Sequence, residues 1–224
     1  MKDIVIVGHG GLAREVAFLL GEINRATPTW NLLGYIASDP KSVSTTVGRH
    51  IVLGTDEWLL KSTKETAVAI AIGQPSRLRA LHERFRQNSK LSFPSLIHPS
   101  VSGDWERMTL DFGNIVLNNA SFTTDIKLGS FNIINPGATI AHDCILGNYN
   151  LVNPGASLSG EVVLADEILV GTGARVLQRL RVCSRSVIGA GAVVTRSIEK
   201  PGVYIGVPAK EMSTLHASPE GGPP

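Results

Sequence analysis

The sequence predicts two domains of different class, an α/β domain with a parallel sheet at residues 1–97 and an all-β domain of short stacked strands at 98–212. Strand-like and helix-like segments alternate in the first, and a six-residue repeat runs through the second. With 23 Gly, 12 Pro and only 5% aromatic residues, many tight turns around a core of small and aliphatic side chains are expected. Residues 213–224 are polar and contain Gly and Pro, and we expect a disordered tail there.

The first domain begins with a short β-branched run, Asp3 to Val7, that ends at a glycine-rich loop and is typical of a buried strand. The next segment, Leu12 to Ile23, has apolar residues at the spacing of a helix face. The further expected elements are strands at 32–36, 51–53 and 67–72, a short helix capped by Thr55, and a basic amphipathic helix at 76–86. This order predicts a small Rossmann-like domain.

In the second domain, every sixth residue from Leu110 to Val194 is aliphatic or Phe, and four positions later a small or apolar residue often follows. A period of six fits neither a helix nor strands joined by hairpins. It fits a prism in which each unit forms one short side and three units complete a coil. The aliphatic residue then points inward and the small residue lies at a tight corner.

Composition excludes several classes of protein. The 21 Lys and Arg against 19 Asp and Glu leave a formal charge of +2, which argues against a dedicated nucleic-acid binder. The two cysteines, Cys144 and Cys183, are too few for a disulfide framework and favour a reducing, cytoplasmic setting. The apolar run near the N-terminus is too short for a signal peptide or a membrane span.

Four segments together carry a family resemblance: 7–11 with Glu15 and Val16, 96–100, 135–144 and 202–210. In these segments the chain resembles the hexapeptide-repeat acyltransferases, and within them the sialic acid O-acetyltransferase/nucleotide-aminosugar N-acetyltransferase family of the bacillosamine-pathway type. The resemblance implies a left-handed parallel β-helix. It also implies a homotrimer with acetyl-CoA between neighbouring subunits, where the active sites would lie.

His142 is the candidate catalytic base. It follows the inward Ile140 by two residues, so we expect its side chain outside the prism, beside Asp143. Acetyl transfer to an amine needs a base, and an imidazole titrates near neutral pH, while a neighbouring carboxylate can orient it or raise its basicity. The resemblance implies these roles for His142 and Asp143. The alternative is a surface histidine without a catalytic role.

Other positions of the repeat match cofactor and substrate contacts of the family. Asn135 and Asn153 lie one coil apart, and such asparagines often satisfy backbone groups, but the resemblance implies that Asn135 contacts the substrate amine or the acetyl carbonyl. It also implies acetyl-CoA contacts at Leu151, Thr172 and Ala190. The family commonly has a histidine at the position of Leu151, so that one contact is in doubt.

The first loop, Gly8-x-Gly10-x-x-Ala13, has the spacing of a dinucleotide-binding fingerprint. In the family this loop binds the diphosphate of a nucleotide sugar. The resemblance implies substrate contacts at six positions: Gly8, His9, Gly10, Ser38, Asp39 and Gly73. A packing role for His9 is the alternative.

We therefore interpret the protein as an acetyl-CoA-dependent N-acetyltransferase that acts on the amino group of a nucleotide-linked amino sugar by direct attack. No cluster has metal-ligand spacing, so no metal is expected. O-acetylation of a sialic acid or similar sugar is the nearest alternative. A non-catalytic β-helix scaffold is a second alternative, favoured by Leu151. A nicotinamide-dependent oxidoreductase is disfavoured by the short first domain and the long repeat.

Overall fold

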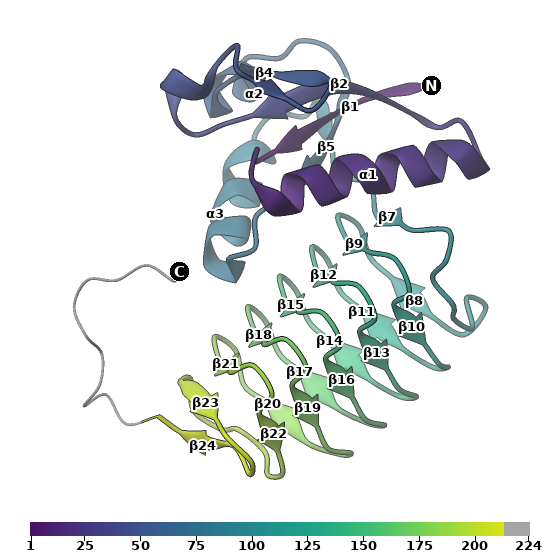
Figure 1. Ribbon diagram of the computed structural model, residues 1–224, viewed down its shortest axis with the longest axis vertical. Coiled ribbons are helices and arrows are strands. Elements are labelled where there is room, and N and C mark those ends of the chain that lie inside the picture. Colours follow the sequence, from purple (N-terminus) through teal and green to yellow (C-terminus); the bar gives the residue numbers. More distant parts are fainter. Residues whose placement is uncertain (213–224) are drawn as a thin grey trace.

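The computed structural model describes residues 1–212, and the expected disordered tail, 213–224, lies outside the described residues. Figure 1 shows an α/β domain lying against one side of a column of short stacked strands. The fold class predicted from the sequence, an α/β domain followed by a left-handed parallel β-helix, is confirmed.

The first domain is built on one six-stranded sheet with the strand order β3-β4-β2-β1-β5-β6. Neighbouring strands are parallel except for β3 and β4. In β1, the side chains from Ile4 to Val7 are all buried, as expected for a strand covered on both faces. The strands are β1 Lys2–Val7, β2 Trp30–Ile36, β3 Thr46–Val47, β4 His50–Gly54, β5 Thr66–Ile70 and β6 Leu91–Ser92.

Three α-helices and one 3₁₀ turn connect these strands: α1 Gly11–Ala26, α2 Asp56–Leu60, α3 Pro75–Phe85 and the turn Pro40–Ser42. The helices begin and end within a few residues of the ranges expected from the sequence. Thr55 is the N-cap residue of α2, but the expectation that its side chain caps the helix is wrong, because that side chain makes no capping hydrogen bond. The edge strands β3 and β6 were not expected, since two-residue strands leave no periodic pattern.

The six-residue repeat forms three sheets, one on each side of a prism, and their strands are parallel except for the last pair of one sheet. Strands of one sheet pair in register with an offset of one coil, so that Ile134 lies beside Val152. The docked face, named for the domain that covers it, contains β7 Leu96–Ile97, β9 Ile115–Val116, β12 Ile133–Ile134, β15 Leu151–Val152, β18 Leu169–Val170, β21 Val187–Ile188, β23 Val203–Ile205 and β24 Lys210–Glu211. This sheet starts at Leu96, just before the expected domain boundary.

The second and third faces contain the other strands of each coil. The second face contains β10 Ser121–Phe122, β13 Thr139–Ile140, β16 Ser157–Leu158, β19 Arg175–Val176 and β22 Val193–Val194. The third face contains β8 Thr109–Leu110, β11 Lys127–Leu128, β14 Ile145–Leu146, β17 Val163–Leu164 and β20 Arg181–Val182. The inward residues of the repeat form the core of the prism, together with small corner residues such as Ala138 and Ala156.

Each coil therefore has three corners. The glycine corner joins the docked face to the second face and contains residues 135–138 and their equivalents in the other coils. The charged corner joins the second face to the third and contains residues 141–144 and their equivalents. The docking corner joins the third face back to the docked face at residues 147–150 and their equivalents.

The two domains share one apolar core. The outward residues of the docked face, among them Ile115, Ile133 and Leu151, belong to the same buried cluster as the strands and helices of the first domain. Figure 1 shows α1 and α3 above this face. Burial of these apolar side chains away from water stabilises the packing of the first domain against the docked face.

Candidate functional site

His142 and Asp143 lie in the turn between β13 and β14, at the charged corner. Nδ1 of His142 is 2.8 Å from Oδ2 of Asp143, and the two side chains are 56% and 57% exposed. A neutral imidazole that donates its Nδ1–H to this carboxylate has a free electron pair on Nε2. The pair can therefore present a proton acceptor at the surface of the β-helix.

Gly160 is the residue one coil after His142 in the same column. A Cβ atom at Gly160 would lie 2.5 Å from Cε1 and 2.6 Å from Nε2 of His142, so only glycine leaves room for the ring. The φ angle of Gly160 is not positive, so this requirement is one of space and not of backbone conformation. The backbone N–H of Gly160 has no hydrogen-bond acceptor within residues 1–212. Sequence reasoning missed Gly160, although the coil length of the repeat points to it.

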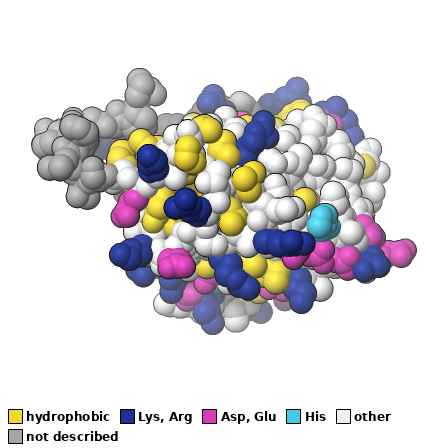
Figure 2. All heavy atoms as spheres, turned by 90° about the horizontal axis from the view of Figure 1, so that it is seen from below, with side chains coloured by type: hydrophobic (Ala, Val, Ile, Leu, Met, Phe, Trp, Pro, Cys, Tyr) yellow, Lys and Arg dark blue, Asp and Glu magenta, His cyan; other side chains and the backbone are white. Residues whose placement is uncertain are grey.

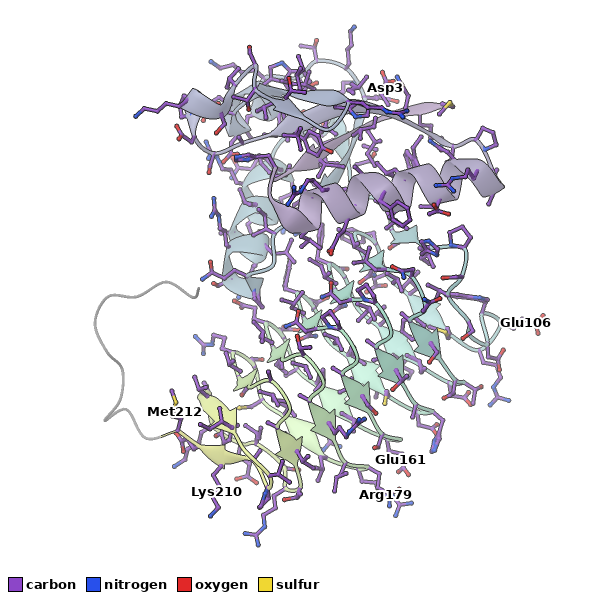
Figure 3. The ribbon with its side chains drawn as sticks, viewed as in Figure 1. Asp3, Glu106, Glu161, Arg179, Lys210 and Met212 are labelled. Carbon is purple, nitrogen blue, oxygen red and sulfur yellow. The ribbon has the colours of Figure 1, made fainter. Side chains whose placement is uncertain are left out.

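A column of charged side chains runs along the same corner at Arg107, Asp125, Asp143, Glu161 and Arg179. Arg107 binds Asp125 at 2.8 Å, and Arg179 binds Glu161 at 2.9 Å (Figure 3 labels the second pair). The hydrogen bond from Arg107 holds the pKa of the Asp125 carboxyl below its ordinary value. Asp143, between the two pairs, has His142 as its partner.

The surface around this corner is charged and slightly hollowed. Figure 2, which views the molecule from below, shows an exposed histidine beside a group of acidic side chains. A cavity of about 300 Å³ lies beside Asp143 and is also lined by Arg107, Asp125, Lys127 and Ile145. The hollow can accept a polar group next to the His142–Asp143 pair.

Asn135, Thr172 and Ala190 lie at the glycine corner, not with His142. Asn135 is 6% exposed, and its Nδ2 donates to Oδ1 of Asn153 at 3.3 Å. Thr172 and Ala190 are exposed on adjacent coils. Four glycines of this corner, one in each of four successive coils, have positive φ angles and open space where a Cβ would lie: Gly137, Gly155, Gly173 and Gly191. The corner therefore presents a strip of accessible backbone.

Leu151 lies apart from that strip. It is on the docked face, 6% exposed, and belongs to the apolar core shared by the two domains. A Cβ atom on Gly73 would be 4.0 Å from its Cδ2. Where the family commonly has a histidine, this chain thus has a leucine that packs between its two domains.

A second candidate site is a cavity of about 460 Å³ beyond the carboxyl ends of β1, β2 and β5, the position where open α/β sheets bind ligands. Five of the six predicted substrate contacts line it: Gly8, His9, Gly10, Ser38 and Gly73. Gly8 has φ +104°, and a Cβ there would lie 2.8 Å from the carbonyl oxygen of Ala71. The close approach of two strand ends thus requires a glycine at this position.

Asp39 is the predicted contact that does not line this cavity. Its Oδ1 accepts a hydrogen bond from the backbone N–H of Lys41 at 2.9 Å and caps the 3₁₀ turn. Three polar residues that the sequence did not single out do line it, namely Asp56, Gln74 and Arg77. They come from the starts of α2 and α3. The folded sheet brings these two helix ends close to the loop at Gly8.

Cys144 lies in the core of the prism, as expected. It is fully buried, its Sγ donates to the carbonyl oxygen of Ser159 at 3.1 Å, and burial raises the pKa of its thiol to about 11. Within residues 1–212 there is no group of three or more metal-ligating side chains, and no helix in that range is long and apolar enough to cross a membrane.

The described fold is similar to known acetyltransferases. The PglD N-terminal domain family matches residues 3–85. A sequence comparison with curated proteins gives no match. PerB from Caulobacter crescentus, solved with CoA and GDP-perosamine, is 29% identical with a TM-score of 0.85, over 95% of this chain and 98% of that one. The acetyltransferase domain of PglB from Neisseria gonorrhoeae, solved with acetyl coenzyme A, is 27% identical with a TM-score of 0.85, over 94% and 99%.

A third structure, WeeI from Acinetobacter baumannii, is 24% identical with a TM-score of 0.83, over 95% of this chain and 100% of that one, and shows the shared fold. These matches extend over nearly the whole chain and include both domains. The family resemblance seen in the sequence is confirmed by them.

Proposed function

Because the chain is a hexapeptide-repeat acyltransferase of the sialic acid O-acetyltransferase/nucleotide-aminosugar N-acetyltransferase family, we propose that it transfers an acetyl group from acetyl-CoA to the amino group of a nucleotide-linked amino sugar. The observation that carries the proposal is the exposed His142–Asp143 pair, with 2.8 Å between Nδ1 and Oδ2, at a corner of the β-helix. The complexes of PerB with CoA and GDP-perosamine and of the PglB domain with acetyl coenzyme A support both substrate classes.

The proposed reaction is a direct attack. The amine nitrogen attacks the thioester carbonyl while Nε2 of His142 takes its proton, and the negative charge of Asp143 stabilises the resulting imidazolium. The C–S bond then breaks, the new C–N bond remains, and the imidazolium returns a proton to the CoA thiolate. The free N–H of Gly160, next to the ring, is suited to stabilise the carbonyl oxygen as it becomes an oxyanion.

A covalent acetyl-cysteine intermediate is disfavoured. Cys144 is close to His142 in sequence, but its thiol is buried and its pKa is raised to about 11. Only the thiolate is an effective nucleophile, and at neutral pH this thiol is protonated. The direct route needs no such group.

The topology supports an active site shared between two copies of the chain. The charged corner joins the second and third faces, so it is the one corner that does not border the docked face. The cavity of the first domain lies on the docked side, away from His142. A nucleotide sugar held there would meet the His142 of a neighbouring copy, in agreement with the homotrimer that the family resemblance implies.

The open strip at the glycine corner is the proposed contact for the pantetheine arm of acetyl-CoA. Thr172 and Ala190 are exposed there, and backbone groups of the strip are within reach of an extended ligand. Asn135 lies on the same corner and is the proposed contact for the acetyl carbonyl or the substrate amine. We also infer a cytoplasmic setting, because acetyl-CoA and nucleotide sugars are found there.

The test is a thiol-release assay with acetyl-CoA and a panel of UDP-, GDP- and dTDP-linked 3-amino and 4-amino sugars, with neutral hydroxylamine applied to the product. Turnover with an amino sugar and a product that resists hydroxylamine support N-acetylation, because amides resist and esters are cleaved. A hydroxylamine-labile product would replace this proposal by O-acetylation. A protein that binds CoA and nucleotides but transfers no acetyl group to any acceptor would support the scaffold alternative.

A further inference from the structure

Arg77 is the one arginine of α3 whose guanidinium has no carboxylate partner within residues 1–212. Arg79 binds Glu167 at 2.6 Å, and Arg84 binds Asp56 at 2.8 Å and also Glu57. Just past the helix, Arg86 binds Glu83 at 3.2 Å. Arg77 instead donates from Nη2 to the hydroxyl of Ser38, at 3.0 Å.

That hydrogen bond joins two residues that line the cavity of the first domain. Arg77 comes from the first turn of α3, Ser38 follows the carboxyl end of β2, and both residues line the cavity. A neutral hydroxyl is a weak partner for a guanidinium, which pairs best with two oxygens of a carboxylate or a phosphate. The guanidinium is thus held in the cavity lining by a contact that an oxyanion can replace.

The rest of the cavity lining also favours an anion. The N-termini of α1 and α3, at Gly10 and Gln74, both border it, and neither helix has an acidic residue in its first turn or a side-chain cap. The carboxylate that does border it, Asp56, is already bound by Arg84. Each helix N-terminus is equivalent to about +0.5 charge, so two of them with Arg77 sum to about +2. This balances the two negative charges of a diphosphate diester.

We propose that Arg77 binds the diphosphate of the acceptor substrate, the nucleotide-linked amino sugar, in this cavity and makes the site selective for nucleoside diphosphates over monophosphates and nucleosides. This inference rests on the proposed function, since it assigns a residue to the nucleotide-sugar site. On binding, the guanidinium exchanges the Ser38 hydroxyl for two phosphate oxygens, while the loop at Gly8 and the N-terminus of α1 contact the same group from the other side. Arg77 is a binding residue and takes no part in proton transfer.

The experiment is calorimetric titration of the full chain with UDP, GDP and dTDP and with the matching monophosphates, for the wild type, Arg77→Gln, Arg77→Lys and Arg86→Gln. Arg86→Gln is the matched control, because this arginine lies just past the other end of the same helix and outside the cavity lining. We expect Arg77→Gln to weaken diphosphate binding by about 10- to 100-fold, the range of a charged hydrogen bond, and to weaken monophosphate binding less. Arg77→Lys should recover part of the loss.

CoA binding by each variant provides a check of folding, because CoA is expected at the β-helix. If the wild type and Arg77→Gln bind a diphosphate equally well, Arg77 has no binding role, and the proposed function is unaffected. If the wild type binds CoA but none of the diphosphates, the cavity is not a nucleotide site, and the proposed function is contradicted as well. A loss in Arg86→Gln as large as in Arg77→Gln would also contradict the proposal, because a general charge effect would then explain both.

Discussion

Nδ1 of His142 lies 2.8 Å from the carboxylate of Asp143, between two coils whose acidic residues are each bound by an arginine. Asp143 is therefore free to act on the imidazole alone. We expect Asp143→Asn to lower kcat by roughly 10- to 100-fold, with little change in the KM for acetyl-CoA or for the amino sugar. This loss in kcat is smaller than the 10²- to 10⁴-fold that a general base supplies. Steady-state thiol release measures this. Asp125→Asn is the matched control, and equal losses in both variants would contradict a specific role for Asp143.

Gly160 provides the space that the His142 ring occupies. We expect Gly160→Ala to displace the ring, because the new methyl would lie 2.5 Å from Cε1, and to lower kcat by about 100-fold while CoA affinity is kept. Gly21→Ala in α1 is the control, since a Cβ there meets nothing within 4 Å. If kcat of Gly160→Ala stays within twofold of the wild type while the protein melts normally, the positioning role of Gly160 is excluded.

Two inactive variants should restore activity to each other if the active site is shared between copies. His142→Ala removes the base, and Gly73→Trp fills the nucleotide cavity at a position without a positive φ angle. Co-expression with two affinity tags yields mixed oligomers, in which an intact cavity faces an intact His142. For random head-to-tail trimers we expect on the order of a quarter of the wild-type rate. Mixed trimers with no activity would mean that each site lies within a single chain.

The domain contact contains a buried histidine that makes stability depend on pH. His82 is 7% exposed, its Nδ1 is 2.8 Å from the hydroxyl of Tyr149, and its ring centroid is 4.0 Å from that of Phe131. Burial lowers the pKa of His82; the nearby charges act less, Glu83 raising it and Arg86 lowering it. The unfolded chain therefore binds a proton at a higher pH than the folded chain does, and stability falls as the pH drops below about 6.5.

We expect thermal unfolding to show this as a larger loss of Tm between pH 7.5 and pH 5.5 for the wild type than for His82→Gln, which keeps a polar contact but does not titrate. For a chain of this length, 1 kcal/mol corresponds to roughly 2–4 °C in Tm. Parallel pH dependence of the two proteins would show that His82 protonation does not contribute.

Much of the fold follows from the sequence because the repeat is strict. The inward position of Ile140 predicts that His142 lies outside the prism, and the small residue Ala138 lies at a buried corner as expected. The docked face also left a signal that was overlooked. The residue before the inward position is aliphatic in every third unit, as at Ile115, Ile133 and Leu151, and outward aliphatic residues on one face predict a covering domain.

The remaining site residues depend on contacts between distant segments. Arg77 differs from the other α3 arginines in lying in the first turn, and only the folded sheet places that turn beside the cavity. Asp39 carries the expected residue type at the expected position, yet its carboxylate is used by a local turn. A short polar side chain can always bind its own backbone instead of a ligand, and spacing does not tell the two apart.

The role of His142 as the proton acceptor is tested by the rate at which His142→Ala transfers an acetyl group to the accepted amino sugar. We expect a kcat at least 100-fold below that of the wild type, with unchanged binding of CoA and of the nucleoside diphosphate in equilibrium dialysis, because only the proton acceptor has been removed. A His142→Ala variant that transfers the acetyl group within twofold of the wild-type rate would show that His142 is not the base.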